Sequence, residues 1–345
     1  MSHEIDLEKY NVRTDLAIEA IANIKSETGI KSHVDETGGL TITTVYLDSL
    51  GSNKIGKPEG SYITIEFDDV TDYDNKEKVK EVFSEKLKEM LSFLKITDDD
   101  LILIVGLGNE KSTPDSLGPL VINNIVVTNH LYLLNGLGAG FKRVCALKPG
   151  VMGTTGFETS DLIKSIVGNL KPDLLIVIDS LASQSVERLN KTIQMTDSGI
   201  NPGSGIGNNR KAINKQEIGI PVIAVGIPTV VDAVTIVSDT FNYMHKHFSY
   251  SKQNINNPLN RLIPVTSINY LKQQYSIKKQ DKEQLLGMVG SLNDSELKQL
   301  IFEVLTPIGY NLMVTPKEVD FLMDQLGDII GNGINRALHK NINNI

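Results

Sequence analysis

The sequence predicts an α/β fold: a three-layer, doubly wound and mostly parallel sheet with helices on both faces. Four short apolar runs have the length and composition of buried parallel strands, at residues 101–105, 143–147, 174–178 and 221–225. Amphipathic segments separate the first three runs and another follows the last, at residues 117–134, 159–170 and 229–247. Strands and helices that alternate over this length indicate a sheet covered on both sides.

Further elements are predicted on either side of this core. Residues 40–47 and 61–67 are β-branched and alternate in polarity, which is typical of strands, and residues 192–195 are a candidate for another. The spacing of apolar residues predicts helices at 76–94, 291–305 and 315–338. Thr315, with Glu318 three residues later, has the form of a helix-capping box. The core should therefore carry an amino-terminal β segment and carboxyl-terminal helices.

Composition indicates an ordinary globular protein of one large or two medium-sized domains. The 345 residues are 40% hydrophobic and 22% charged, with a formal net charge of -8. An acidic chain without a basic patch is not expected to bind nucleic acid directly. No signal peptide or membrane-spanning run is visible, so we expect an intracellular protein. The single cysteine, Cys145, lies in an apolar stretch and is interpreted as a core residue.

Two aspartates stand where an α/β protein places its chemistry. Asp179 ends the apolar run at 174–178, and Asp115 follows the run at 101–105 and a glycine-containing turn. Parallel strands end at the crevice where ligands bind, and two carboxylates there can share a proton and activate water. Hydrolysis is therefore the first hypothesis. Each aspartate has a structural alternative, since Thr113-Pro114-Asp115 also fits a helix start and Asp179 also fits a helix cap.

The remaining motifs give no cofactor or metal prediction. The turn after residue 105 begins like a dinucleotide fingerprint, but Lys111 occupies the position of the third glycine. The glycine-dense loop at 199–208 lacks the ending of a phosphate loop, and its Gly203, Ser204 and Gly205 are candidates for lining a substrate groove. His245 and His247 are two apart on a predicted helix and do not share a face, so a metal site there is not expected.

Blocks of sequence along the whole chain resemble one family. They include Thr113-Pro114-Asp115-Ser116-Leu117-Gly118-Pro119 and Ile178-Asp179-Ser180-Leu181-Ala182. The others are residues 10–19, 105–109, 149–156, 197–200, 203–207, 226–233 and 311–320. Taken in chain order, these blocks resemble the germination proteases of spore-forming bacteria. The polar stretch at 249–283 and the loop around 50–60 carry little of the resemblance.

The resemblance implies an endopeptidase that degrades small acid-soluble spore proteins during germination and is made as a self-cleaving zymogen. The corresponding bond is Asp15–Leu16. Substrates of the family are cut next to an acidic residue followed by an apolar residue and alanine, and Asp15-Leu16-Ala17 has that form, with Glu19 nearby. The segment resembles a tethered pseudo-substrate. A helix start at Thr14 or Asp15 is the alternative interpretation.

The family's proposed catalytic aspartates correspond to Asp115 and Asp179. If Asp115 lies in the first turn of a helix, the dipole favours its ionised form, so we expect it to be the base. The core also resembles hydrogenase-maturation endopeptidases, whose equivalent acidic positions bind nickel, which keeps a metal-dependent alternative open. A non-catalytic spore-protein binder is the other alternative.

The resemblance further implies a homotetramer in the forespore or spore core. It divides the chain into a propeptide, residues 1–15, and a single peptidase domain, residues 16–345. Within that domain we expect the α/β core at 97–248, a surface excursion at 249–283 and the carboxyl-terminal helices at 284–345. Because the first 15 residues are present, the precursor is the expected form.

Overall fold

A computed structural model describes residues 14–22, 28–203, 210–254, 279–305, 312–340 and 342. The chain divides into two compact units, which are described separately. The larger unit comprises residues 13–231 and 315–345, and the smaller comprises residues 232–314 together with 1–12. The larger unit holds the sheet and the candidate site. The prediction of a single peptidase domain stays a prediction.

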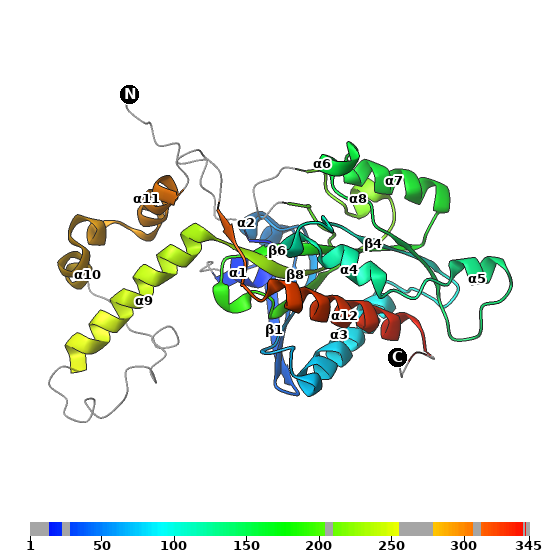
Figure 1. The fold of residues 1–345 in the computed structure, drawn as a ribbon, viewed down its shortest axis with the longest axis horizontal. Helices are drawn as coiled ribbons and strands as arrows, with labels where there is room; N and C mark the ends of the chain where they lie inside the picture. The colour runs from blue at the N-terminus through cyan, green and yellow to red at the C-terminus, as the bar shows by residue number, and fades with distance from the viewer. Residues whose placement is uncertain are drawn as a thin grey trace. The chain divides into compact units, whose positions relative to one another are not determined.

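The larger unit is built on a sheet with the strand order β1-β2-β3-β7-β8-β6-β4-β5 (Figure 1). Its parallel part consists of β5, β4, β6 and β8, which are adjacent in that order. Their bounds are β4 (Leu101–Gly106), β5 (Arg143–Leu147), β6 (Leu174–Ser183) and β8 (Val222–Asp232). The four predicted apolar runs therefore all form strands, and β6 and β8 extend several residues beyond them.

The other strands are antiparallel and complete the sheet on the β8 side. They are β1 (Ile30–Thr37), β2 (Leu40–Leu47), β3 (Gly60–Glu66) and β7 (Thr192–Thr196). The strand β1 has no counterpart among the predicted elements, because every residue after Ile30 is exposed and the strand has no apolar face. Gly38 and Gly39, both with positive φ, form the tight turn that joins β1 to β2.

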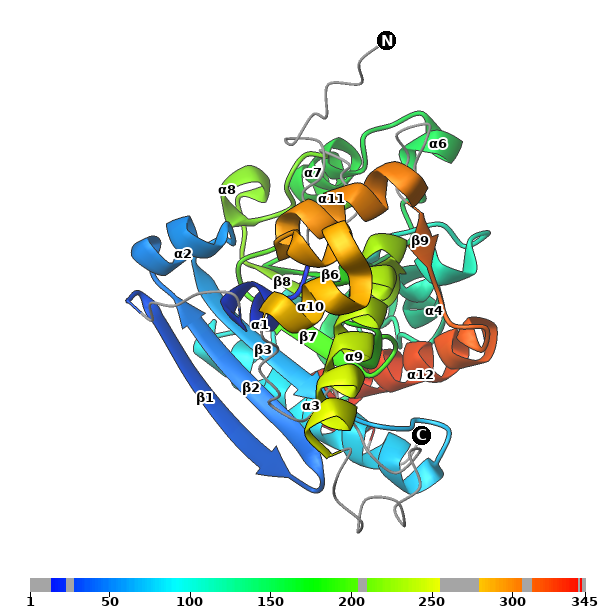
Figure 2. The ribbon, with the colours of Figure 1, turned by 90° about the vertical axis from the view of Figure 1, so that its left-hand side faces the viewer.

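Helices cover both faces of the sheet, as Figures 1 and 2 show. One face packs against α7 (Thr159–Leu170) and α8 (Lys215–Ile218). The other face packs against α3 (Tyr73–Phe93), α4 (Leu117–Asn123) and α12 (Val319–Leu338). Alternate residues of a strand face opposite layers: Ile102 and Ile104 face the second group of helices, and Leu103 and Val105 face the first. The predicted doubly wound α/β fold is confirmed.

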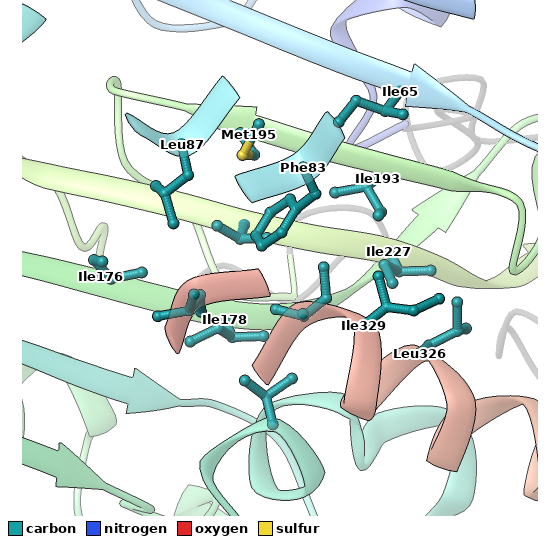
Figure 3. Packing of buried hydrophobic residues seen from close by; sticks show 14 of the residues in the cluster. Ile65, Phe83, Leu87, Ile176, Ile178, Ile193, Met195, Ile227, Leu326 and Ile329 are labelled. Atoms are coloured by element: carbon teal, nitrogen blue, oxygen red, sulfur yellow. The ribbon is translucent and has the colours of Figure 1, made fainter. Parts of the chain in front are cut away.

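The layer between the sheet, α3 and α12 contains the larger hydrophobic cluster (Figure 3). Phe83 of α3 is fully buried and lies among side chains of the sheet and of α12. Gly333 of α12 faces it, since a Cβ at that glycine would lie 2.4 Å from the Phe83 ring. The absence of a side chain at Gly333 therefore lets the two helices approach closely around the aromatic ring.

Shorter helices connect these elements. They are α1 (Ala17–Ala22), α2 (Ser49–Ile55), α5 (Asn129–Leu133) and α6 (Met152–Thr155). Two 3-10 helices join them, η1 (Thr113–Asp115) and η2 (Val186–Arg188). Among the described residues, no helix is long and apolar enough to cross a membrane.

The smaller unit contains α9 (Ala233–Asn254), α10 (Lys279–Leu286), the 3-10 helix η6 (Gly287–Ser291), α11 (Asp294–Leu305) and the two-residue strand β9 (Met313–Val314). Its apolar cluster joins α9 and α11 through Val234, Leu297 and Ile301. Most of the predicted surface excursion at 249–283 lies outside the described residues.

Three predicted helices differ from those observed. The segment 117–134 forms α4 and α5 rather than one helix, and between them the Val126 N–H donates to Asn335 Oδ1 at 2.9 Å. The helix predicted from residue 229 begins at Ala233, because β8 continues through Asp232. The helix α12 begins at Val319, and the Thr315 hydroxyl donates to the Thr229 carbonyl instead of forming a capping box.

Candidate active site

Asp179 is a buried carboxyl group in the central strand β6. The prediction that it ends the strand is wrong, since β6 continues through Ser183 and Asp179 pairs in register with Gly226 of β8. Its side chain is buried, and its Oδ1 accepts a hydrogen bond from the Ser180 N–H at 2.9 Å. The ladder with β8 fixes the backbone on which this carboxyl stands.

Asp115 is held by the loop that follows β4. It is the last residue of the 3-10 helix η1, whose N-cap is Ser112 rather than Thr113, and α4 begins at Leu117. The Asn109 N–H donates to the Asp115 carbonyl at 2.8 Å and to its Oδ2 at 3.0 Å. A Cβ at Gly108, whose φ is +108°, would lie 2.1 Å from the Asp115 carbonyl oxygen. Gly108 therefore lets the loop close on Asp115.

The two aspartates interact electrostatically. Burial raises the pKa of Asp179 well above its usual value, and the charges of Asp115 and Asp15 raise it further. Burial also raises the pKa of Asp115, but the Asn109 N–H and the charge of Arg210 oppose this shift. Asp179 is therefore the group that stays protonated to higher pH, and Asp115 is the more readily ionised group. Such a pair can supply an acid and a base to one reaction.

Asp15 lies against the same strand as Asp179. Its N–H donates to the Ala182 carbonyl at 3.1 Å, and its Oδ2 accepts from the Ala182 N–H at 2.9 Å. On the preceding residue, the Thr14 carbonyl accepts a hydrogen bond from Lys57 Nζ. Because the charge of Asp15 also raises the pKa of Asp179, the acidic residue before the predicted cleavage bond lies near Asp179.

The two residues after that bond, Leu16 and Ala17, are held by burial. The side chains of Leu16 and Ala17 are fully buried, and Ala17 packs in a cluster with Val45, Leu47 and Tyr62. The helix α1 starts at Ala17, two residues after Asp15 and three after Thr14, the alternative helix starts given by the sequence. The segment enters an apolar environment immediately after its acidic residue.

Glu19, four residues after Asp15, is buried and has specific partners. Its carboxylate accepts hydrogen bonds from Ser183 Oγ at 2.6 Å and from the Gln184 N–H at 2.7 Å. Arg188 Nη1 lies 3.4 Å from its Oε1. These contacts join α1 to the end of β6 and to η2.

Gln194 of β7 contacts the backbone on both sides of Leu16. Its Nε2 donates to the Asp15 carbonyl at 3.0 Å, and its Oε1 accepts from the Ala17 N–H at 2.7 Å. The sequence analysis did not single out Gln194, Arg188, Arg210 or Lys57. A lone amide or cation within a strand or loop gives no motif in a single sequence.

The sequence analysis also weighed residues elsewhere in the chain. Gly203 belongs to a turn, whereas Ser204 and Gly205 lie outside the described residues. Cys145 is half-buried on β5, and burial raises the pKa of its thiol, which does not favour a nucleophilic thiolate. His245 and His247 lie on α9 of the smaller unit. Within the described ranges, no group of three His, Cys, Asp or Glu side chains could hold a metal ion.

Sequence comparison identifies the family to which these residues belong. A family model described as germination protease matches residues 7–345. The chain belongs to the germination protease family. Germination proteases of Bacillus velezensis and of Bacillus cereus are both 44% identical to it, and each alignment covers 99% of this chain and 97% of the relative. The germination protease of Bacillus anthracis is 43% identical. The chain is thus an endopeptidase and a protease of spore germination.

Structure comparison finds a weaker likeness. The NiFe hydrogenase maturation protease HycI of Thermococcus kodakarensis aligns with a TM-score of 0.27 and 16% sequence identity, over 42% of this chain and 80% of that protein. The assignment to the germination protease family rests on the sequence relatives.

Proposed function

We propose that this germination protease is a zymogen that cleaves its own Asp15–Leu16 bond and then cuts small acid-soluble spore proteins. The observation that carries the proposal is the position of Asp15, hydrogen-bonded to Ala182 on the strand that bears Asp179. The chain's own acidic-Leu-Ala sequence is thus bound on the strand of Asp179, which interacts with Asp115 and can form an acid–base pair with it. A substrate of the same form can take its place.

The proposal includes the division of the chain. Residues 1–15 are the propeptide and residues 16–345 the peptidase domain, with its core at 97–248. The enzyme works in the forespore and spore core as a homotetramer. This part of the proposal rests on the resemblance to the family. The proposed substrate groove includes Gly203, and the predicted groove residues Ser204 and Gly205 lie outside the described residues.

The chemistry is hydrolysis with acid–base assistance. Ionised Asp115 takes a proton from a water molecule, whose oxygen attacks the carbonyl carbon of the acidic residue. Protonated Asp179 donates its proton to the carbonyl oxygen. Breakage of the C–N bond and transfer of a proton to the leaving amine complete the reaction. The pKa shifts support these roles, because burial and the charges of Asp115 and Asp15 raise the pKa of Asp179 well above its usual value, whereas the Asn109 N–H and Arg210 oppose the rise at Asp115.

The decisive experiment is a digest of an acid-soluble spore protein by the chain that begins at Leu16. The same chain with Asp115→Asn or Asp179→Asn is tested beside it, and Asp161→Asn, a surface residue paired with Lys211, is the control. Mass spectrometry locates the cuts. We expect cleavage between an acidic residue and an apolar-Ala pair, reduced about 10²–10⁴-fold by either active-site substitution.

The other outcomes contradict parts of the proposal. Cleavage that survives both substitutions in folded protein discards the aspartate mechanism and keeps the peptidase. Cleavage that responds to a chelator or to added nickel favours the metal-dependent mechanism. If the folded chain binds the spore protein but cuts it under no condition, the proposed substrate is wrong and a binding role replaces it.

A further inference from the structure

Gln194 faces the same side of the sheet as Asp179. Strand pairing places Gln194 of β7 opposite Gly226 of β8, and Gly226 opposite Asp179 of β6. Residues paired across neighbouring strands direct their side chains to one face. Gln194 and Asp179 are therefore separated by two strand spacings, about 10 Å between backbones, with a glycine between them.

The segment from Asp15 to Ala17 is bound from the two strands on either side of β8. Asp15 bonds to Ala182 of β6 on one side and to Gln194 of β7 on the other, and β8 lies between those strands. The Leu181 side chain occupies the space above Gly226, where a Cβ would lie 2.6 Å from Leu181 Cγ. The segment that contains the proposed cleavage bond is thus held between β6, the strand of Asp179, and Gln194 of β7.

The two hydrogen bonds of Gln194 determine the orientation of its amide. The Asp15 carbonyl can only accept, and the Ala17 N–H can only donate, so Nε2 must face Asp15 and Oε1 must face Ala17. The side chain is itself buried. One neutral amide therefore binds the carbonyl of the cleavage bond and the N–H of the second residue after it.

We infer that Gln194 binds the substrate backbone and donates a hydrogen bond to the scissile carbonyl, both in self-cleavage and in cleavage of other proteins. This inference rests on the proposed function. The carbonyl oxygen becomes negative as water adds to its carbon, and a fixed donor in a buried site stabilises that charge. The oxygen has two lone pairs, so it accepts from Gln194 and from protonated Asp179 together. Because Gln194 is uncharged, it adds no positive charge that would favour the ionised form of Asp179.

The first test is self-cleavage of the full chain with Gln194→Met or Gln194→Glu. Methionine keeps the length of the side chain and removes both hydrogen bonds, and glutamate replaces the donor with an acceptor when ionised. Gln325→Glu is the control, since Gln325 lies on α12 and accepts a hydrogen bond from Lys76 of α3 at 2.8 Å. We expect about 10²–10³-fold slower cleavage for both Gln194 variants and an unchanged rate for the control.

A pH profile separates a donor role from a structural one. A protonated glutamate regains an O–H donor, so the rate of Gln194→Glu relative to wild type should rise as the pH falls. The rate of Gln194→Met relative to wild type should stay low at every pH. Wild-type rates in folded Gln194→Met would overturn the inference.

The second test leaves the protein unchanged. A peptide of residues 10–22 is N-methylated at the position of Ala17, which removes the N–H that donates a hydrogen bond to Gln194. A matched peptide is N-methylated at the position of Ile18. For the chain that begins at Leu16, we expect kcat/KM to fall at least tenfold more with the first peptide. Equal losses refute the Gln194 contact in trans. Failure of the wild-type chain to cut itself, the unmethylated peptide or a spore protein refutes the proposed function instead.

Discussion

Asp179 is a carboxyl group kept from water by its position in a central strand, with the charges of Asp115 and Asp15 nearby. Such a group opposes folding when it is ionised. The free energy of unfolding therefore decreases as the pH rises from the usual aspartate value of 3.8 towards the raised value in the folded protein. The folded protein binds the proton more tightly than the unfolded chain does across that interval.

Asp179→Asn should stabilise the protein at neutral pH. The amide carries no charge to bury, and its oxygen still accepts the Ser180 N–H. Thermal unfolding should show a higher Tm for the variant, with a difference that shrinks as the pH falls towards 4. Asp161→Asn, at the surface, should show no such gain. A lower Tm for Asp179→Asn at neutral pH would contradict burial of an ionisable, destabilising group.

Peptidase activity should have a bell-shaped dependence on pH. Catalysis requires ionised Asp115 and protonated Asp179, and burial raises both pKa values. The two groups interact, so the limbs of kcat/KM report apparent values of the pair. Initial rates with a short peptide should show both limbs above the usual aspartate range. A rate that is constant from acid to alkaline pH would exclude this pair as the acid and base.

The element that carries Asp115 is fixed by a close approach of α4 to β4. A Cβ on Gly118 would lie 2.1 Å from the Leu107 carbonyl oxygen, and a Cβ on Gly106 would lie 2.2 Å from the Gly118 carbonyl oxygen. Both contacts are with backbone atoms, which cannot change rotamer to make room for a Cβ. Two glycines thus set the distance between this strand and the helix that follows Asp115.

Gly118→Ala should destabilise the protein by about 1–3 kcal/mol or more, because the strand and helix must separate. It should also slow peptidase activity, since η1 moves with α4. Gly153→Ala is the control: it lies in α6, no atom is within 4 Å of its added Cβ, and alanine favours a helix. Denaturant unfolding compares the stability of the two variants, and initial rates with a short peptide compare their activity. Equal stability of the two variants would refute the close-contact explanation.

Whether an element was predictable depended on whether burial left a pattern in its sequence. The parallel strands are apolar runs because both of their faces are covered, and they were predicted. The strand β1 pairs through its backbone and is exposed after Ile30, so its sequence carries no such signal. The break between α4 and α5 coincides with contacts to Asn335, about 200 residues away, which local periodicity cannot reveal.

The candidate site was predictable to the extent that its residues end or follow apolar runs. Asp115 and Asp179 were found in this way, and Asp15–Leu16 through the family resemblance. Gln194 lies between Ile193 and Met195, which face the larger cluster, so alternation predicts that its side chain points away from that cluster. The pattern does not reveal that a peptide segment, rather than water, lies on that other side.

The larger unit as a whole depends on hydrophobic clusters on the two faces of its sheet. The cluster on the α3 and α12 side joins strands from β2 to β5 with three helices that are distant in sequence. Phe83 is fully buried at its centre (Figure 3). Phe93, on the same helix, is 76% exposed.

Phe83→Ala should reduce the free energy of unfolding by about 3–5 kcal/mol, because it leaves a cavity where α3, α12 and the sheet meet. Phe93→Ala should change it by about 0.5 kcal/mol or less. Guanidinium unfolding followed by circular dichroism compares the two. A similar loss for both variants would show that α3 does not pack on the sheet through Phe83.

The way residues 14–19 are held has a consequence for the timing of activity. Under the proposed self-cleavage, only the part before Leu16 is released. Leu16 and Ala17 are buried and Glu19 is bound to Ser183, and all three stay joined to the chain through α1. The cut chain thus retains its own reaction product as a tethered competitor, at an effective concentration on the order of millimolar. An incoming protein must displace it, so the cut and the onset of activity are separate events.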